Sequence, residues 1–183
     1  MYKINTAPAS EPITSDQAKT HLKVSGSDED NLITNLIVAA RQHAEKYLRK
    51  SLISQTWDLY LDEFEDVNYI FKGPIQSITH VKYYDTSNEE QTWDSSKYDA
   101  DLVSEPARII VADGYSYPSL RDKPNAVNIR FVAGYGDAAD VPDQILQGMY
   151  LYITFLYEHR GDEAYRPPKA VYDLWNDYRT DWL

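Results

Sequence analysis

The chain has 183 residues and contains no cysteine. This absence excludes disulfide bridges, a thiolate nucleophile and zinc sites with cysteine ligands. No run approaches the roughly 18 apolar residues that a membrane-spanning helix requires, and residues 1–6 lack the apolar core of a signal peptide. We therefore expect a soluble protein that is made in a cytoplasm and has no membrane partner.

Concentrated positive charge is also missing. The chain carries 18 basic and 29 acidic side chains, a net charge of -11. Residues 1–50 are nearly balanced, whereas residues 51–136 have seven basic against fourteen acidic side chains and residues 137–183 have four against nine. A protein that grips DNA needs a basic face, because neutralising phosphates and releasing their counterions supplies most of the affinity. The composition therefore argues against tight DNA binding.

Motifs for catalysis, cofactors and metals are lacking as well. The four histidines are not paired at helical spacing, as zinc ligands usually are. Gly134-Tyr135-Gly136 has neither the Lys-Ser/Thr of a Walker loop nor the third glycine of a dinucleotide loop, and Gly-x-Ser-x-Gly is absent. The glycines instead supply unusual backbone angles where a strand turns toward a helix. We predict no catalytic residue, no cofactor and no metal.

The two ends of the chain have helical patterns. Thr14 and Gln17 have the spacing of a capping box, which predicts a helix that ends near Val24. A second helix is expected from Ser27 or Asp28 to residue 50, with Arg41, Glu45 and Arg49 on its solvated side. The helical period returns after residue 140, with Asp140 or Val141 as cap and Pro142 in the first turn. A last helical segment is expected over 168–183.

The middle of the chain has the pattern of short strands. Trp57, Leu59 and Leu61 alternate with polar residues, as in a half-buried strand. Further strands are expected near 69–71, 78–84, 91–93, 98–102, 108–111 and 127–132, with a long loop over 112–125. The prediction is an α+β fold in one domain, 1–183. It comprises an extended arm 1–13, helical parts 14–50 and 140–180 that form a helical core, and an antiparallel β insertion 54–136.

Aromatic residues are abundant, with 16 tyrosines and four tryptophans. Tyrosine and tryptophan combine a large apolar area with a polar tip and are enriched at the centres of protein interfaces. The C-terminal segment is too short to bury its own rings, so we expect it to dock onto a neighbouring subunit or partner without being needed for the fold. The predicted interface residues are Tyr115, Tyr117, Tyr172, Trp175, Tyr178, Trp182 and Leu183.

Several short motifs, in a fixed order, resemble those of the head–tail connector (adaptor) proteins of tailed bacteriophages, prophages and phage-like gene transfer particles. They begin with the cap at Ile13-Thr14 and continue with Ala44-Glu45-Lys46-Tyr47, Gln55-Thr56-Trp57 and Gly73-Pro74-Ile75-Gln76-Ser77-Ile78-Thr79. They end with Ser104-Glu105-Pro106-Ala107-Arg108-Ile109, Arg130-Phe131-Val132-Ala133-Gly134-Tyr135-Gly136-Asp137 and Tyr157-Glu158-His159-Arg160. Each motif alone is weak, but the order and spacing together cover residues 12–160.

The resemblance implies a structural virion protein at the head–tail junction, assembled in the host cytoplasm, and no enzyme. Similar proteins form a ring, commonly of twelve copies, between the portal protein and a tail-side stopper or terminator protein. DNA passes through the lumen without specific binding. The acidic balance suits such a channel, because negative charge would let DNA slide without sticking, within a Debye length of about 8 Å.

Two other functions stay open at this point. The aromatic residues could form the ligand face of a carbohydrate-binding or other ligand-binding module. Less favoured is a small hydrolase, since 29 acidic residues always allow some pair of carboxylates to be imagined as a catalytic site. The sequence gives no means of choosing such a pair.

Overall fold

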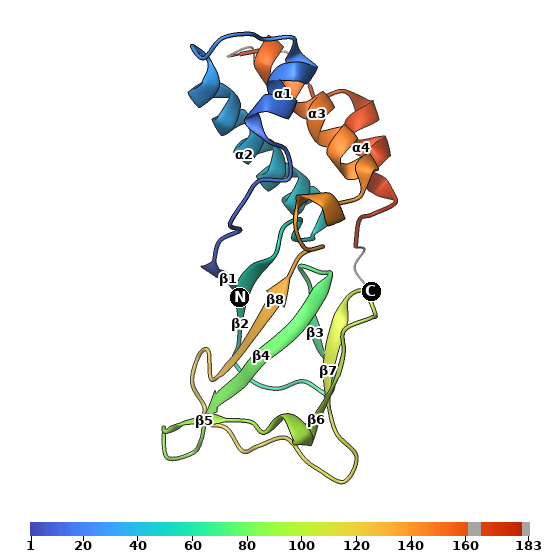
Figure 1. Ribbon diagram of the computed structural model, residues 1–183. Helices are drawn as coiled ribbons and strands as arrows, with labels where there is room; N and C mark the ends of the chain where they lie inside the picture. Colours follow the sequence, from blue (N-terminus) through green and yellow to red (C-terminus); the bar gives the residue numbers. More distant parts are fainter. Residues whose placement is uncertain (161–165, 181–183) are drawn as a thin grey trace. The chain divides into compact units, whose positions relative to one another are not determined.

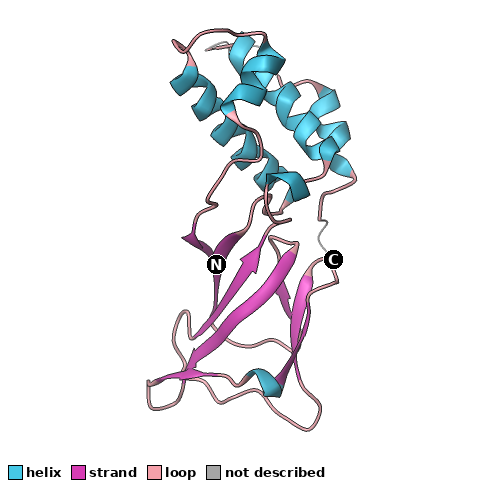
Figure 2. Ribbon diagram, in the orientation of Figure 1, coloured by secondary structure: helices cyan, strands magenta, loops and turns pink. Residues whose placement is uncertain are grey.

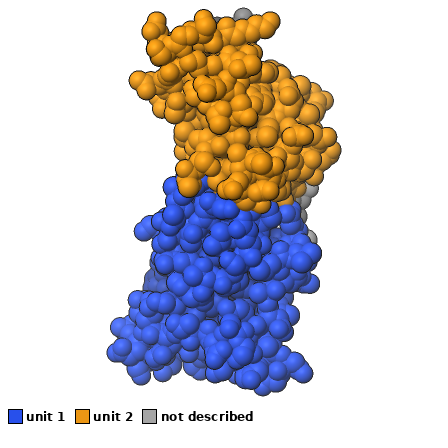
Figure 3. All heavy atoms as spheres, viewed as in Figure 1, with its two compact units in different colours: residues 1–8, 54–134 blue, residues 9–53, 135–183 orange. Residues whose placement is uncertain are grey.

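The computed structural model describes residues 1–160 and 166–180, and within them the chain forms four α-helices and eight strands (Figures 1 and 2). The fold is α+β, as predicted. The chain divides into two compact units, coloured separately in Figure 3. A β unit contains residues 1–8 and 54–134, and a helical unit contains residues 9–53 and 135–183. Each unit has its own hydrophobic core.

The helical unit consists of α1 (Ser15–Leu22), α2 (Asp30–Leu48), α3 (Asp143–Glu158) and α4 (Lys169–Asn176), with a 3-10 turn η2 (Ala138–Asp140) before α3. Apolar residues recur on α2 at spacings of three and four, so that Ile33, Ile37 and Leu48 share one buried stripe. This stripe packs in one cluster with Met149 of α3 and Trp175 of α4. The core of the unit thus joins its N-terminal and C-terminal helices, as expected.

The capping box at the start of α1 is confirmed. The Thr14 Oγ1 accepts from the Gln17 backbone N–H at 3.2 Å, and the Gln17 Oε1 accepts from the Thr14 N–H at 2.8 Å. Most other helix boundaries differ from the prediction by one to three residues, but α4 ends at Asn176, although the last helical segment was expected over 168–183. α2 starts at Asp30 after Glu29, and Pro142 is the residue before α3, because η2 takes up Asp140.

The expected solvated face of α2 is wrong at Arg41. This side chain is buried, with 7% of its residue surface exposed. Its Nε donates to Glu11 at 2.7 Å and its Nη1 donates to Glu45 at 2.9 Å. A buried guanidinium requires such partners. Spacing along one helix could not reveal Glu11, which approaches from the segment before α1.

The β unit contains a five-stranded and a three-stranded antiparallel sheet. The larger sheet has the order β1-β2-β8-β4-β5 and the smaller one the order β3-β7-β6. The strands are β1 (Tyr2–Thr6), β2 (Gln55–Leu61), β3 (Asn68–Ile70), β4 (Ile75–Tyr84), β5 (Glu90–Thr92), β6 (Tyr98–Asp101), β7 (Ala107–Val111) and β8 (Val127–Ala133), with a 3-10 turn η1 (Ser95–Lys97). The predicted strands are therefore present, with shifted ends.

One face of each sheet contributes to the shared core of the β unit. Val127, Ile129 and Phe131 alternate along β8 and are fully buried, as the period of two predicts. They belong to one cluster with Ile70 of β3 and Ile109 of β7. The two sheets therefore bury a common layer of side chains.

The N-terminal arm also differs from the prediction. Residues 1–13 were expected to be an extended arm, but Tyr2–Thr6 form β1, an edge strand that pairs with β2. The Tyr2 hydroxyl accepts from the Phe71 N–H at 2.9 Å, and burial raises the pKa of Tyr2 to about 12. The β unit is thus built from both the chain start and the central segment.

In the part of the chain that the structure describes, none of the helices has the length and apolar character needed to cross a membrane.

Candidate functional site

The aromatic residues predicted to meet partners belong to two different units, as far as the structure describes them. On the helical unit, Trp175 of α4 is completely buried. Its Nε1 donates to the Ile145 carbonyl at 3.1 Å, and its ring lies close against Gly148 of α3. Trp175 is therefore a core residue, and the expectation that the fold does not need it is wrong. One face of α4 is buried because it packs on α3. Helical spacing alone could not show which element covers this face.

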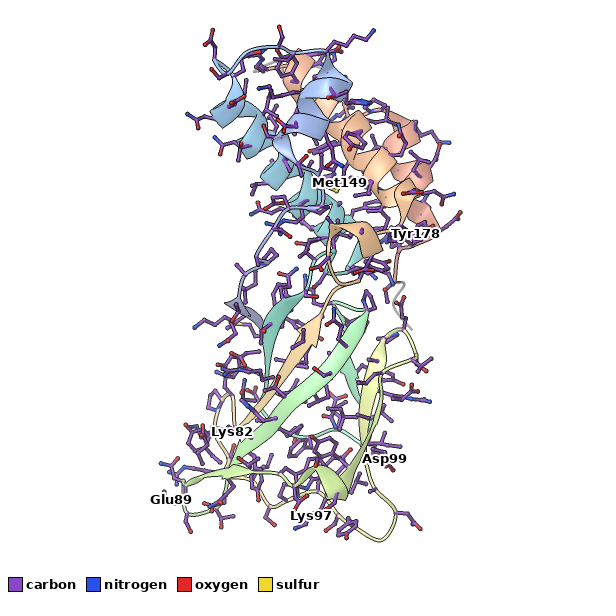
Figure 4. The ribbon with its side chains drawn as sticks, in the orientation of Figure 1. Lys82, Glu89, Lys97, Asp99, Met149 and Tyr178 are labelled. Carbon is purple, nitrogen blue, oxygen red and sulfur yellow. The ribbon has the colours of Figure 1, made fainter. Side chains whose placement is uncertain are left out.

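Tyr172 and Tyr178 lie at the margin of this core and are half-buried. The Tyr172 ring centroid is 5.0 Å from that of Tyr47, and its hydroxyl is 3.3 Å from His43 Nε2. The His43 ring stacks on Tyr152 with centroids 4.5 Å apart. Figure 4 labels Tyr178 at the outer edge of the helical unit and Met149 within it. Tyr172 and Tyr178 are only partly exposed, and an interface role for them stays a prediction.

Tyr115 and Tyr117 belong to the β unit and differ from each other. Tyr117 stacks on Phe64, and its ring centroid is 5.4 Å from that of Trp93. Tyr115 is 52% exposed. Of the two, only Tyr115 offers a largely free ring for contact. The remaining predicted residues, Trp182 and Leu183, lie outside the described part of the chain.

The face of the five-stranded sheet opposite the core carries a polar network that sequence reasoning missed. Arg130 of β8 donates from Nε and Nη2 to the two carboxylate oxygens of Asp58 on β2, at 2.8 and 3.0 Å. Asn128 and Asn5 also donate to this carboxylate, each at 3.3 Å. His80 Nε2 lies 3.0 Å from Asn128 Oδ1. The network therefore links β1, β2, β8 and β4.

The Asp58 carboxylate is almost inaccessible, although alternation predicted a solvated position. Burial alone would raise its pKa, but hydrogen bonds from Arg130 and Asn128 and the charge of Arg130 together lower the pKa below its ordinary value. The hydrogen bonds that Arg130 donates to Asp58 raise the pKa of Arg130 in turn. A carboxylate that stays ionised beside a fixed guanidinium holds strands together and is unsuited to accept a proton at neutral pH.

A hollow of about 250 Å³ opens beside this network, lined by Tyr60, His80, Lys82, Tyr83, Glu90 and Arg130, among others. Figure 4 labels Lys82 on this part of the β unit. Its cations pair with carboxylates of the same unit, Lys82 with Glu90 at 2.7 Å and Arg130 with Asp58. The hollow therefore offers partnered polar groups and no nucleophile with an adjacent base. No group of three or more potential metal ligands occurs among the described residues.

A second hollow, on the helical unit, has a different character. It measures about 310 Å³ and is lined by His43, Lys46, Tyr47, Arg49 and Arg179. These residues come from the end of α2 and from the segment after α4, which are more than 120 residues apart in the sequence. We call this hollow the basic pocket. The chain has a net charge of -11, so three cationic side chains around one hollow are not expected from its composition alone.

The turn after β8 has the backbone that its glycines predict. Gly134 and Gly136 have φ angles of 132° and 139°, in the region that side chains with a Cβ rarely adopt. A Cβ at Gly136 would lie 2.2 Å from Asp140 Oδ2. Asp140 in turn accepts from the Asp137 N–H at 2.8 Å and closes η2. This turn leads from β8 into η2.

Comparison with known proteins identifies a matching protein family. A family model described as phage gp6-like head-tail connector protein matches residues 13–109, which is more than half of the chain. No curated protein matches the sequence.

Solved structures with a similar fold cover the whole chain. A chain in the neck of an empty GTA particle, computed with C6 symmetry, has a TM-score of 0.83 and 23% identity over 100% of this chain and 97% of its own. A chain in the virion of a native gene transfer agent (GTA) particle has a TM-score of 0.84 and 24% identity, with the same coverage. A chain in the neck of a native GTA particle, computed with C12 symmetry, gives 0.83 and 23%, again with this coverage. At this level of identity the likeness establishes the fold.

Proposed function

Since this chain belongs to the family of phage gp6-like head–tail connector proteins, we propose that it acts as one subunit of a closed ring beneath the portal. It is a structural protein of the junction between head and tail. The observation that carries this conclusion is the family match over residues 13–109. The carbohydrate-binding and hydrolase alternatives have no comparable support.

The proposed ring has twelve copies and contacts the portal protein on one side and a stopper or terminator protein on the other. Support for a ring comes from the fold, which is shared with chains in GTA necks computed with C6 and C12 symmetry. A ring of identical subunits needs a heterologous contact, in which two different patches of the chain meet. The two structural units supply distinct surfaces for such contacts.

DNA is proposed to pass through the lumen of this ring without specific binding. The acidic surplus supports the idea, because it is spread over both units: 14 acidic against 8 basic side chains in the β unit and 15 against 10 in the helical unit. A wall of either unit would then repel phosphates at distances within about 8 Å, the Debye length at physiological salt. A density map of the assembled ring with a neutral or basic channel wall would contradict this proposal.

The chain is proposed to have no enzymatic activity. Two carboxyl groups with lowered pKa values have structural explanations: Asp58 is paired with Arg130, and Asp101 accepts hydrogen bonds from Ser104, which lower its pKa to about 2. A carboxyl group that acts as a general acid or base at neutral pH would need a pKa nearer to neutrality. Release of product from small-molecule substrates by the purified chain would overturn this statement.

The decisive experiment combines the purified chain with its cognate portal protein. We expect a ring seated on the portal, detected by native mass spectrometry and electron cryomicroscopy. Deleting the gene should give filled heads and free tails that do not join. Normal particles in the absence of the protein would refute the proposed function, whereas a monomer in the absence of portal is compatible with it.

A further inference from the structure

The basic pocket is organised before any partner binds. Arg49 Nη1 donates to the Thr180 carbonyl at 3.2 Å, and the Arg179 guanidinium lies 5.1 Å from the centroid of the Tyr47 ring. The Thr180 N–H donates to the Leu48 carbonyl at 3.0 Å, which fastens this segment to the end of α2. Ordered cations bind an anionic partner with a smaller loss of side-chain entropy.

The pocket is lined by three cationic side chains, Lys46, Arg49 and Arg179. Burial and the neighbouring charge of Lys46 lower the pKa of His43, so that the imidazole adds no charge there. Lys46 is exposed and forms no ion pair within residues 1–160 and 166–180. Cations near the C-terminus of a helix do stabilise its dipole. This effect accounts for Lys46 and Arg49, whereas Arg179 comes from the segment after α4 and lies over the Tyr47 ring.

A loop of the β unit has the opposite charge. We call residues 62–66, Asp-Glu-Phe-Glu-Asp, the acidic loop; it has four carboxylates in five positions. Its four acidic residues are exposed. Glu63, Glu65 and Asp66 form no ion pair with the rest of the described chain. Such a cluster of like charges repels itself unless a cationic partner covers it.

The acidic loop is also rigidly held. The side chain of Asn68, which is buried, accepts from the Glu65 N–H at 3.1 Å and donates to the Glu65 carbonyl at 2.9 Å. The ring of Phe64 is anchored 5.1 Å from both Trp93 and Tyr117, and the Tyr117 hydroxyl donates to the Asp66 carbonyl at 3.1 Å. The fold therefore fixes four exposed carboxylates on one loop, of which Asp62 also accepts from the Asn125 N–H of its own unit at 2.7 Å.

We propose that the acidic loop of one copy docks into the basic pocket of the next copy. This inference rests on the proposed ring, and it identifies two different patches that a head-to-tail contact requires. Charge complementarity favours this occupant, since the chain itself supplies a preformed anionic ridge for a preformed cationic hollow. Such pairs fix the register of an interface and exclude wrong partners.

Reversing each patch separately tests the proposal. The pocket variant is Lys46→Glu with Arg179→Glu, and the loop variant is Glu63→Lys with Glu65→Lys. Each is studied with the cognate portal, under the conditions in which the unaltered chain forms rings, after circular dichroism has established that it is folded. We expect each variant alone to lose at least about tenfold in ring yield, measured by native mass spectrometry, because like charges then face each other.

An equal mixture of the two variants should restore rings, with the two variants alternating. The reversed pocket then meets a reversed loop, and each normal pocket meets a normal loop. A pairing within one copy would not be rescued by mixing. The control variant, Lys23→Glu with Lys169→Glu, has the same change of charge on the helical unit away from the pocket and should keep its ring yield.

The proposal is overturned if either folded variant forms rings as the unaltered chain does, or if the mixture fails to restore them. Failure of the unaltered chain to form a ring with its portal would instead refute the proposed function. The two failures are therefore distinguishable.

Discussion

At the scale of single residues, the close packing of Trp175 against Gly148 joins α4 to α3 in the core of the helical unit. A Cβ at position 148 would lie 2.2 Å from Trp175 Nε1. Glycine inside a helix is unfavourable by roughly 1 kcal/mol relative to alanine, so its presence in α3 needs a reason. The reason is the close approach of α4, whose fully buried indole occupies the space of the missing side chain.

Truncating this indole should destabilise the helical unit. Replacing a buried tryptophan by alanine typically costs roughly 3–5 kcal/mol, through lost burial and the cavity that remains. We expect a decrease of this size for Trp175→Ala in urea unfolding, followed by circular dichroism at 222 nm. Tyr115→Ala, at a position that is 52% exposed, should change stability by less than about 0.5 kcal/mol. Equal stability of both variants would contradict the core assignment.

Filling the space at position 148 should also be harmful. Gly148→Ala should lower stability by roughly 1–3 kcal/mol, the usual cost of overpacking, despite the better helix propensity of alanine. Gln147→Ala, at the exposed neighbouring position, should be neutral or slightly stabilising. Thermal unfolding of both variants measures the difference. A more stable Gly148→Ala protein would show that α4 does not pack here.

At the scale of elements, polar contacts fix segments that hydrophobic spacing leaves undetermined. Arg41 joins α2 to Glu11 in the segment before α1, and Asp58 joins three strands of the larger sheet through Arg130 and Asn5. Because such groups are buried or half-buried, losing one partner leaves the other unsatisfied. These contacts therefore determine the packing of neighbouring elements.

The ion pair between Asp58 and Arg130 should make the β unit sensitive to acid. The pKa of Asp58 is lowered in the folded state, so its stabilisation is complete above about pH 4, the ordinary value for an unfolded aspartate, and is lost as pH falls through the folded pKa. Asp58→Asn should thus lose less stability than the unaltered chain between pH 5 and pH 2. The exposed Asp99→Asn is the control and should follow the unaltered curve. Identical curves for all three proteins would refute this role of Asp58.

The capping box at Thr14 should contribute to the stability of α1. Thr14→Ala removes the hydroxyl that accepts from the Gln17 N–H, at an expected cost of about 1 kcal/mol. Ser10→Ala, in the exposed segment before the helix, is the comparison. Urea unfolding of the two variants measures the difference in stability. An equal effect at both positions would show that the capping box does not contribute to stability.

At the scale of the whole molecule, the net charge of -11 governs contact with DNA. The purified chain should give no detectable retardation of double-stranded DNA at about 0.15 M salt, even at protein concentrations near 10⁻⁵ M, where a protein with a basic face binds nonspecifically. Gel retardation over a series of salt concentrations measures this. Binding that weakens steeply as salt increases would contradict the idea of a repelling channel wall.

The sequence by itself determined the type and order of the elements. The period of 3.6 in α2 and the period of two in β8 follow from which residues must face a core, and local rules decide both. The capping box at Thr14 and the glycine backbone at 134 and 136 are equally local. The order of short motifs also sufficed to indicate the connector family, which the family match over residues 13–109 confirms.

Only the tertiary structure decided which side chains are available to partners. Trp175 and Tyr115 were both predicted to contact partners, yet one is fully buried and the other is half exposed. The contacts of Arg41 with Glu11, of Asp58 with Arg130 and of Arg179 with Tyr47 join segments far apart in the chain, and such pairings have no period or motif. Burial and electrostatic environment are set by contacts between distant segments, so the surfaces with which this protein assembles had to be read from its fold.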